Sequence, residues 1–256
     1  MLKNTFLFIT LFISLLQAEP TYFEIGIGHY NNRSSGANGI EAKPDQINLA
    51  IKSFLHAYEQ ESNKVEIGVY LLRCYYYKGK YVSETDDDKK IIFNKGKELG
   101  ESLINNHPKS ASARYWYLAN LGSWSEVYGI LAAAKEGVAN IMRVQAEKII
   151  ELDSKYWNGG GYFMLGGVHL KSPYIPFILS WPNKEKALEY LLKAYETGST
   201  TPVQIVYLAQ GYYKNRQKKM AVSLLEDLIK QPLSEQETVE SLEQKKIAEG
   251  LLEEWR

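Results

Sequence analysis

The side chains that could perform acid–base or metal chemistry are scattered along this chain. The four histidines, at positions 29, 56, 107 and 169, show no spacing that would pair two of them as metal ligands. No His-Glu-x-x-His or Gly-x-Ser-x-Gly motif accompanies them. His169 falls at a packing position of a helical pattern, so we interpret it as a core residue. The sequence gives no support to an enzyme, and we assign no catalytic residue.

Two runs of like residues could in principle bind ions. The carboxylates of Asp86–Asp88 suit a hard cation, but no spaced partner ligands follow them. We interpret them as the first turn of a helix, where acidic groups complement the positive end of the helix dipole. The run Gly159–Gly161 lacks a preceding strand and a following Lys-Ser/Thr pair, so a phosphate loop is not predicted. We therefore expect neither a metal site nor a cofactor.

Composition narrows the class of protein further. The chain has 256 residues, of which 45% are hydrophobic and 23% charged, as is usual for a folded globular protein. Lys and Arg together number 30, as do Asp and Glu, so the net charge is zero. Nucleic-acid binding needs clustered cations, and none stand out. The single cysteine, Cys74, excludes an intrachain disulfide and is expected to pack as a small hydrophobe.

The elements that must position any site are predicted from a repeating order of small and large apolar residues. Segment 202–233 carries this order at Ile205, Leu208, Ala209, Tyr212, Ala221, Leu225 and Leu228, followed by Pro232. These spacings match the packing positions of a tetratricopeptide (TPR) helix-turn-helix unit. Similar pairs are predicted at 66–108, 112–154 and 159–197, and the Glu-rich segment 234–255 is expected to form a polar capping helix. The predicted fold is an all-α, TPR-like helical-hairpin solenoid with a C-terminal capping helix.

The first residues suggest export. Lys3 precedes the apolar run Phe6–Leu16, which is too short to span a bilayer, and Ala18 is a small residue at a plausible cleavage point. We predict a signal peptide over 1–18 and a periplasmic location; a retained N-terminal anchor is the alternative, so membrane association stays open. Segment 19–43 is rich in Gly, Asn and Ser and is expected to be flexible. The helical domain is placed at 44–256.

The concave face of the predicted solenoid offers a candidate groove. On the first helix of each TPR-like pair, fixed offsets face inward, and here they carry aromatic and basic residues. The candidate groove residues are Tyr70, Tyr77, Lys78, Trp116, Asn120, Trp124, Phe163, Lys171, Gln210, Tyr213 and Lys214. An aromatic, mildly basic groove suits an apolar or amphipathic ligand with an acidic end. The alternative is that these aromatic side chains form core against an additional helix.

The insertion 172–182 is a candidate contact loop. Its three prolines exclude an ordinary helix, yet it contains six large apolar side chains. Tyr174, Phe177 and Trp181 are the aromatic members. Such a segment is expected to contact another protomer, a partner or a lipid surface, or else to cover the protomer's own core.

From Ala111 to Ile229 the chain resembles the periplasmic T-component family associated with TRAP-type transporters. The matching stretches are Tyr115–Gly122, Glu147–Asp153, Gly160–Gly161 with Leu165–Gly166, Pro173 and Pro176 before Asn183–Leu191, and Tyr207–Ala209. The resemblance implies an exported all-helical protein with TPR motifs, a trimer, and a transporter solute-binding protein as partner. Members are often lipoproteins, whereas this chain lacks a lipid-attachment cysteine near position 18.

Together these expectations describe a non-enzymatic exported binding or scaffold protein. One form is an accessory component of a TRAP-type transporter that binds a small hydrophobic organic acid. The other is a TPR adaptor for protein–protein contacts in envelope assembly. Co-purified small molecules would favour the first form, and a stable protein partner with an empty groove would favour the second.

Overall fold

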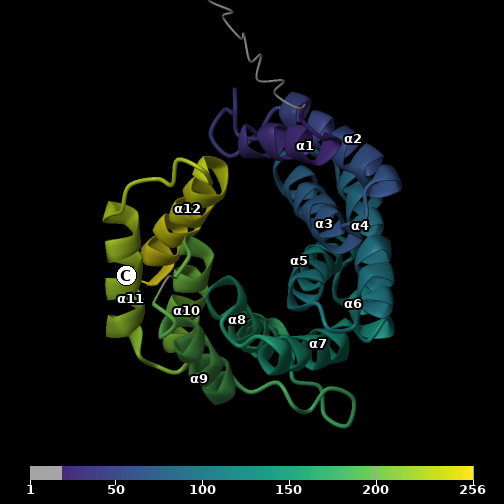
Figure 1. Ribbon diagram of the computed structural model, residues 1–256. Helices are drawn as coiled ribbons and strands as arrows, with labels where there is room; N and C mark the ends of the chain where they lie inside the picture. Colours follow the sequence, from purple (N-terminus) through teal and green to yellow (C-terminus); the bar gives the residue numbers. More distant parts are fainter. Residues whose placement is uncertain (1–18, 199, 256) are drawn as a thin grey trace, which may run out of the picture.

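The computed structural model describes residues 19–198 and 200–255, and its regular elements there are α-helices (Figure 1). The helices are α1 Tyr22–Asn31, α2 Pro44–Gln60, α3 Lys64–Tyr81, α4 Asp86–Asn106, α5 Ala111–Tyr128, α6 Ile130–Lys135, α7 Val138–Leu152, α8 Tyr156–Lys171, α9 Lys184–Tyr195, α10 Pro202–Lys214, α11 Lys218–Lys230 and α12 Thr238–Trp255. Successive helices pack as antiparallel hairpins. The predicted all-α, TPR-like architecture is confirmed.

The hairpin α10–α11 shows how the sequence builds one unit. Thr201 and Gln204 form a capping box at the start of α10, and Pro202 occupies its first turn, where a missing N–H is harmless. The small and branched residues of the repeat pattern then meet between the two helices. The buried positions are Ile205, Leu208, Ala209, Ala221, Leu225 and Leu228. These are the packing residues of the sequence pattern, so the repeat is present in the structure as predicted.

One expectation about the N-terminal region was wrong. Segment 19–43 was expected to be flexible, but it contains α1, which begins with a capping box between Thr21 and Glu24. Phe23, Ile27 and Tyr30 lie one and two turns apart on this helix and pack into the same core as α2. The Gly- and Asn-rich composition of residues 31–39 belongs to the turn after α1 and conceals the helix before it.

The helices curl into a ring in which α12 approaches the N-terminal helices (Figure 1). Arg33, just after α1, forms an ion pair with Glu240 of α12 at 2.7 Å. Glu243, one turn further along, accepts a hydrogen bond from the Tyr81 hydroxyl of α3 at 2.8 Å. Val239 is buried in the N-terminal core. The predicted capping helix thus covers α10 and α11 and also closes the superhelix onto its first repeat.

The predicted signal peptide at 1–18 lies outside the described residues. Within 19–198 and 200–255, no helix combines the length and apolarity that a bilayer crossing requires.

Candidate ligand-binding cavity

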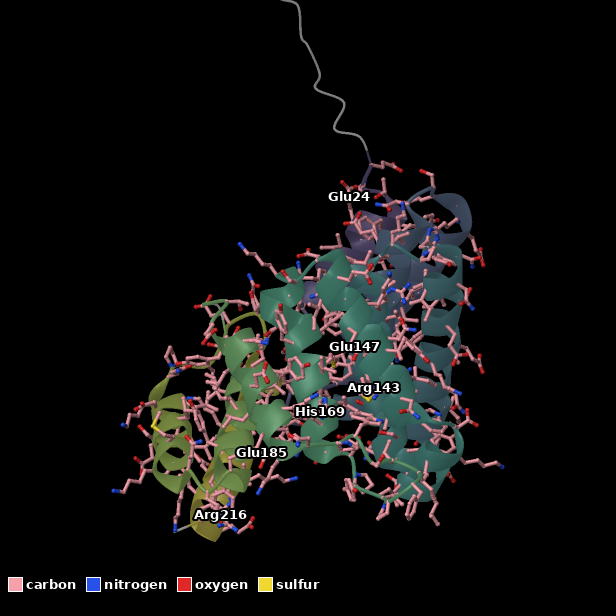
Figure 2. The ribbon with its side chains drawn as sticks, turned by 90° about the horizontal axis from the view of Figure 1, so that it is seen from below. Glu24, Arg143, Glu147, His169, Glu185 and Arg216 are labelled. Carbon is pink, nitrogen blue, oxygen red and sulfur yellow. The ribbon has the colours of Figure 1, made fainter. Side chains whose placement is uncertain are left out.

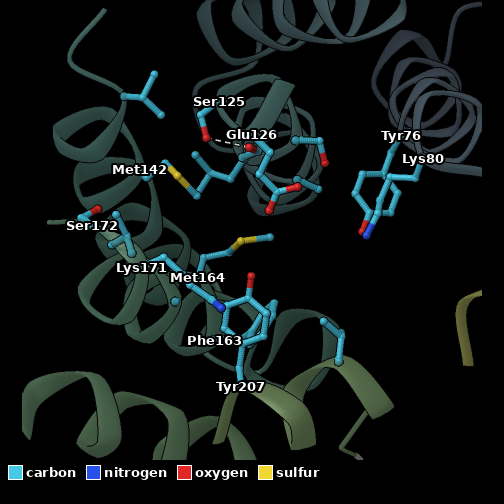
Figure 3. Close-up of a pocket in the computed structure, with 18 of the residues that line it drawn as sticks. Tyr76, Lys80, Ser125, Glu126, Met142, Phe163, Met164, Lys171, Ser172 and Tyr207 are labelled. Atoms are coloured by element: carbon cyan, nitrogen blue, oxygen red, sulfur yellow. Dashed lines mark hydrogen bonds between the residues drawn. The ribbon is translucent and has the colours of Figure 1, made fainter. Parts of the chain in front are cut away.

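The ring encloses a cavity of about 850 Å³ (Figure 3). Most of its wall comes from the inner helix of each hairpin, α3, α5, α8 and α10, and from α12; α6, the start of α7 and the loop after α8 complete it. This volume lies in the range of small-molecule sites. The cavity is therefore the principal candidate site of the fold.

The α3 wall is aromatic and carries one cation. Tyr76, Tyr77 and Lys80 share a face of α3 because they lie about one turn apart, and all three line the cavity. Lys80 Nζ lies 2.9 Å from a carboxylate oxygen of Glu243, so its charge is matched within the ring. Burial raises the pKa of Tyr77 to about 12, which keeps its hydroxyl protonated at neutral pH.

The opposite wall combines α8 and α10. The rings of Phe163 and Tyr207 meet edge to face with centroids 5.2 Å apart. Gly167 allows this approach, because a Cβ there would lie 3.3 Å from the Tyr207 ring. Met164 adds a flexible apolar side chain beside them (Figure 3).

Lys171 at the end of α8 brings a second cation to the cavity. Its ammonium lies 4.9 Å from the centre of the Tyr207 ring and donates to the neutral amide oxygen of Gln210. Burial, followed by the nearby charge of Lys214, lowers the pKa of Lys171. In contrast to Lys80, Lys171 has no carboxylate at ion-pair distance within the described residues. It is available to an acidic ligand group.

The predicted contact loop 172–182 forms one rim of the cavity. Ile175 and Ile178 of the loop line the cavity, and so does Ile130 of α6. At the tip, Phe177 is fully exposed and holds a left-handed φ of 66°. Leu131 of α6 is 84% exposed. The rim therefore presents apolar side chains to solvent.

The base of the loop packs inward. Trp181 lies between His169, with ring centroids 4.9 Å apart, and Arg143, whose guanidinium is 4.6 Å from the Trp181 ring centre; both are labelled in Figure 2. The indole N–H of Trp181 donates to Asn140 at 2.8 Å. Tyr174 is 62% exposed. The loop is thus divided into an anchored Trp181 and an exposed tip.

The structure separates the predicted groove residues into two groups. Those that line the cavity are Tyr77, Trp116, Phe163, Lys171 and Gln210. Those that lie elsewhere are Tyr70, Lys78, Asn120, Trp124, Tyr213 and Lys214. A binding role for either group stays a prediction.

Packing between helices accounts for the second group. Asn120 is fully buried and donates to the backbone carbonyls of Leu72 and Trp116, joining α5 to α3. Trp124 donates to Asn94 of α4 at 2.8 Å. These side chains hold neighbouring helices together.

Tyr213 and Lys78, which also lie outside the cavity lining, likewise contact a neighbouring helix. Tyr213 stacks on Trp255 of α12 with ring centroids 4.1 Å apart. Lys78 donates to Asn48 of α2 at 2.7 Å. In this structure these positions therefore face neighbouring helices and not the cavity.

Sequence reasoning missed several cavity residues. Tyr76, Glu126, Met164 and Tyr207 all line the cavity (Figure 3). Each lies within three residues of a residue that was predicted, so the inner face is wider than the fixed offsets allow. A search for aromatic residues one turn before each predicted position would have found Tyr207, three residues before Gln210.

The remaining sequence predictions concern isolated side chains. His169 is buried, and its ring nitrogen accepts the Asn183 backbone N–H at 3.2 Å, as expected of a core histidine. Asp86–Asp88 form the first turn of α4 behind an N-cap at Thr85. Cys74 is fully buried, and burial raises the pKa of its thiol. Among the described residues, no three potential ligands gather into a metal site.

Comparisons with known proteins support the fold. A family model described as regulator of microtubule dynamics protein 1-3 matches residues 37–166, which are 130 of the 256 residues. A thermophilic TPR protein from Thermus thermophilus is similar in structure, with a TM-score of 0.58 and 13% identity; the match covers 91% of this chain and 96% of that one. At that identity the likeness concerns the fold alone. No curated protein sequence matches the chain.

Proposed function

Since the chain belongs to the family described as regulator of microtubule dynamics protein 1-3, and folds as a TPR-like ring, we propose that it is a non-enzymatic scaffold that binds an amphipathic organic acid inside the ring. The observation that carries this proposal is the cavity of about 850 Å³. The family description concerns microtubule dynamics, a role that the cavity itself gives no ground to assign to this chain.

The lining suits one apolar body with one acidic end. Phe163, Met164 and Tyr207 offer apolar and aromatic surface. Lys171 offers a cation whose hydrogen-bond partner is a neutral amide. Burying an aliphatic chain contributes about 25 cal/mol per Å² of apolar surface, so even a ligand of modest size could be held. A carboxylate reaching Lys171 would add a charge-assisted hydrogen bond.

Titration of the purified chain with dodecanoic acid tests this proposal, with intrinsic tryptophan fluorescence and calorimetry as readouts. Ala119 lines the cavity from α5, so Ala119→Phe should fill part of it and weaken dodecanoate binding at least about tenfold. Ser223→Phe places the same ring on the exposed face of α11 and serves as the matched control. Equal binding by both variants would place the ligand outside the ring and overturn the proposal.

A second candidate function is that of a protein-interaction adaptor. TPR-like solenoids commonly serve as scaffolds for protein contacts. The observation that favours this role here is the exposed tip of loop 172–182, where Phe177 and Ile178 are 103% and 76% exposed. A partner protein that covers this tip would remove apolar surface from water.

The more specific form of the first proposal is an accessory of a TRAP-type transporter. It is supported by the sequence resemblance over Ala111–Ile229, and it includes export, a trimeric state and a solute-binding protein as partner. Fractionation of native cells tests the exported location, since a cleaved protein should begin near Glu19. Recovery of the chain with an intact Met1 in the envelope would support a retained anchor instead.

A further inference from the structure

We propose that Arg73 is an oxyanion-binding residue that holds the acidic end of the cavity ligand, a carboxylate or phosphate group. Arg73 lies on α3 one turn before Tyr76 and Tyr77; those two side chains line the cavity, and Arg73 itself lies behind the lining residues. This inference rests on the proposed function, and it assigns Arg73, in place of Lys171, to the acidic end of the same ligand. None of the sequence patterns singled out Arg73.

An aromatic cage surrounds the Arg73 guanidinium. Its central carbon lies 4.7 Å from the ring centre of Tyr30 and 4.8 Å from that of Tyr70. Trp116 and Trp157 lie at 5.3 and 5.1 Å. Tyr30, Trp116 and Trp157 also line the cavity, so the guanidinium sits behind its aromatic wall. Cation–π contacts of this kind orient a guanidinium, but they supply no full negative charge to match it.

Two hydrogen-bond donors of the cage lack acceptors. Arg73 Nε is buried with no hydrogen-bond partner, and so is Nε1 of the neighbouring Trp116. A buried polar group without a partner is uncommon in a folded protein, and a buried charge without a counterion more so. Two unsatisfied N–H donors beside one cation indicate that an acceptor with negative charge belongs there.

A second arginine shows what is missing at Arg73. Arg33 also stacks on Tyr30, at 4.4 Å, but its guanidinium pairs with the Glu240 carboxylate at 2.7 Å. In the described part of the chain, no carboxylate lies at ion-pair distance from Arg73. Arg33 therefore has a counterion within the fold, whereas Arg73 is left for one from outside. Arg73 keeps partial exposure, which gives an anion access.

Backbone conformation provides an independent sign of a site. Trp157, Asn158 and Gly159 adopt left-handed φ values of 48°, 57° and 72° in succession. For a bulky residue such as Trp157 this conformation is strained, and such strain concentrates at functional sites. Gln204 of α10 holds the turn by donating to the Asn158 carbonyl at 2.9 Å. The strained turn is what places the Trp157 ring beside Arg73.

The test compares ligands that differ only in their head group. Dodecanoate, dodecyl phosphate and dodecanol are titrated into the wild-type chain and into Arg73→Gln. We expect the wild type to bind at least one of the anions more tightly than the alcohol. Arg73→Gln removes hydrogen bonds between a charged group and the anion. We therefore expect it to weaken anion binding about 10- to 100-fold and to leave dodecanol binding unchanged. The two anions distinguish a carboxylate site from a phosphate site.

Matched variants separate recognition from stability. Arg73→Lys keeps the charge and should retain part of the preference for anions. Arg143→Gln removes an arginine that stacks on Trp181 outside the cavity, and this variant should retain the full preference for anions over dodecanol. Unfolding measurements accompany each titration, because Arg73→Gln also removes contacts to four rings. An unchanged anion preference in Arg73→Gln, or its loss only in Lys171→Gln, would overturn the proposal while leaving the cavity proposal intact.

Inorganic phosphate and acetate provide a measurement that needs no apolar cavity ligand. Either anion at millimolar concentration should raise the melting temperature of the wild type, and Arg73→Gln should abolish this shift. If no dodecyl ligand binds but the shift in melting temperature depends on Arg73, the oxyanion site is supported. The proposal that the cavity binds an amphipathic acid is then wrong. If neither anion shifts the wild type and no head-group preference exists, the oxyanion site is wrong.

Discussion

Arg33 and Glu240 are 207 residues apart in the sequence, yet their side chains form a 2.7 Å ion pair. The Arg33 side chain is 3% exposed and that of Glu240 is 22% exposed. Two further contacts, from Lys80 and Tyr81 to Glu243, reinforce the same junction. The ring is therefore closed by polar groups between its first repeat and its last helix.

Removing one partner of this pair should destabilise the closed ring. Glu240→Gln leaves the buried Arg33 charge without a counterion, which costs about 3 kcal/mol of the free energy of unfolding. Denaturant unfolding measures this loss, and small-angle scattering should show a larger radius of gyration as the ring opens.

Asp227→Asn provides the control, because it breaks the exposed ion pair with Lys230 within α11. An exposed pair contributes about 0.5 kcal/mol or less. Equal losses from Glu240→Gln and Asp227→Asn would contradict the role of Arg33 and Glu240 in closure.

A pair of glycine substitutions tests the close packing of α4 on α5. A Cβ at Gly100 would lie 2.4 Å from the Tyr117 ring, so Gly100→Ala should destabilise the fold by about 1–3 kcal/mol. Gly250 lies within α12 with no atom within 4 Å of an added Cβ. Gly250→Ala should stabilise by about 0.5–1 kcal/mol through helix propensity. Thermal unfolding of both variants should show shifts of opposite sign.

His169 should make stability depend on pH below neutrality. Burial, with the nearby charges of Lys186 and Arg143, lowers the pKa of His169 from its ordinary value of 6.5. The unfolded chain therefore binds a proton at higher pH than the folded chain does. The contribution of neutral His169 is complete above pH about 6.5 and is lost as pH falls through its lower folded pKa.

The measurement is the melting temperature between pH 7.5 and pH 5. The wild type should lose more stability over this interval than His169→Gln, whose side chain keeps an acceptor for the Asn183 N–H. Parallel curves for the two proteins would show that His169 does not titrate in this window.

The two parts of loop 172–182 should respond differently to substitution. Phe177 is fully exposed, so Phe177→Ser should change the free energy of unfolding by less than about 0.5 kcal/mol. Trp181 packs on His169, so Trp181→Ser should cost about 2 kcal/mol. If the tip joins copies of the chain, Phe177→Ser should lower the mass measured by light scattering. An unchanged mass, with unchanged partner binding, would exclude a contact role for Phe177.

The repeat architecture could be predicted from the sequence because it depends on local spacing. Leu208, Ala209 and Ala221 identify the helix crossing within one hairpin, and the structure buries all three. The helix α1 was missed because the turn that follows it dominates the composition of 19–43. Its capping box, Thr21 with Glu24, was nevertheless readable in the sequence.

The site could be predicted only in part, because it depends on how the repeats curve. Trp116 and Phe163 follow from position within a repeat and do line the cavity. The cage of Arg73 draws its rings from four separate helices, among them α1 and α8. Ring closure adds Glu243 through a contact between distant segments. No pattern within one repeat contains this information.

Contact between α12 and the first repeat fixes how many hairpins the ring can hold. An open solenoid can lengthen by duplication of a helical pair, since a new unit needs only its neighbours. Here an inserted pair would displace Glu240 from Arg33 and separate α12 from α3. The diameter of the enclosed space is consequently set by the number of units, so relatives that share the closure should vary in side chains rather than in repeat number. In such relatives, the binding properties of the cavity would change through substitutions of the residues that face inward, while the size of the ring stays constant.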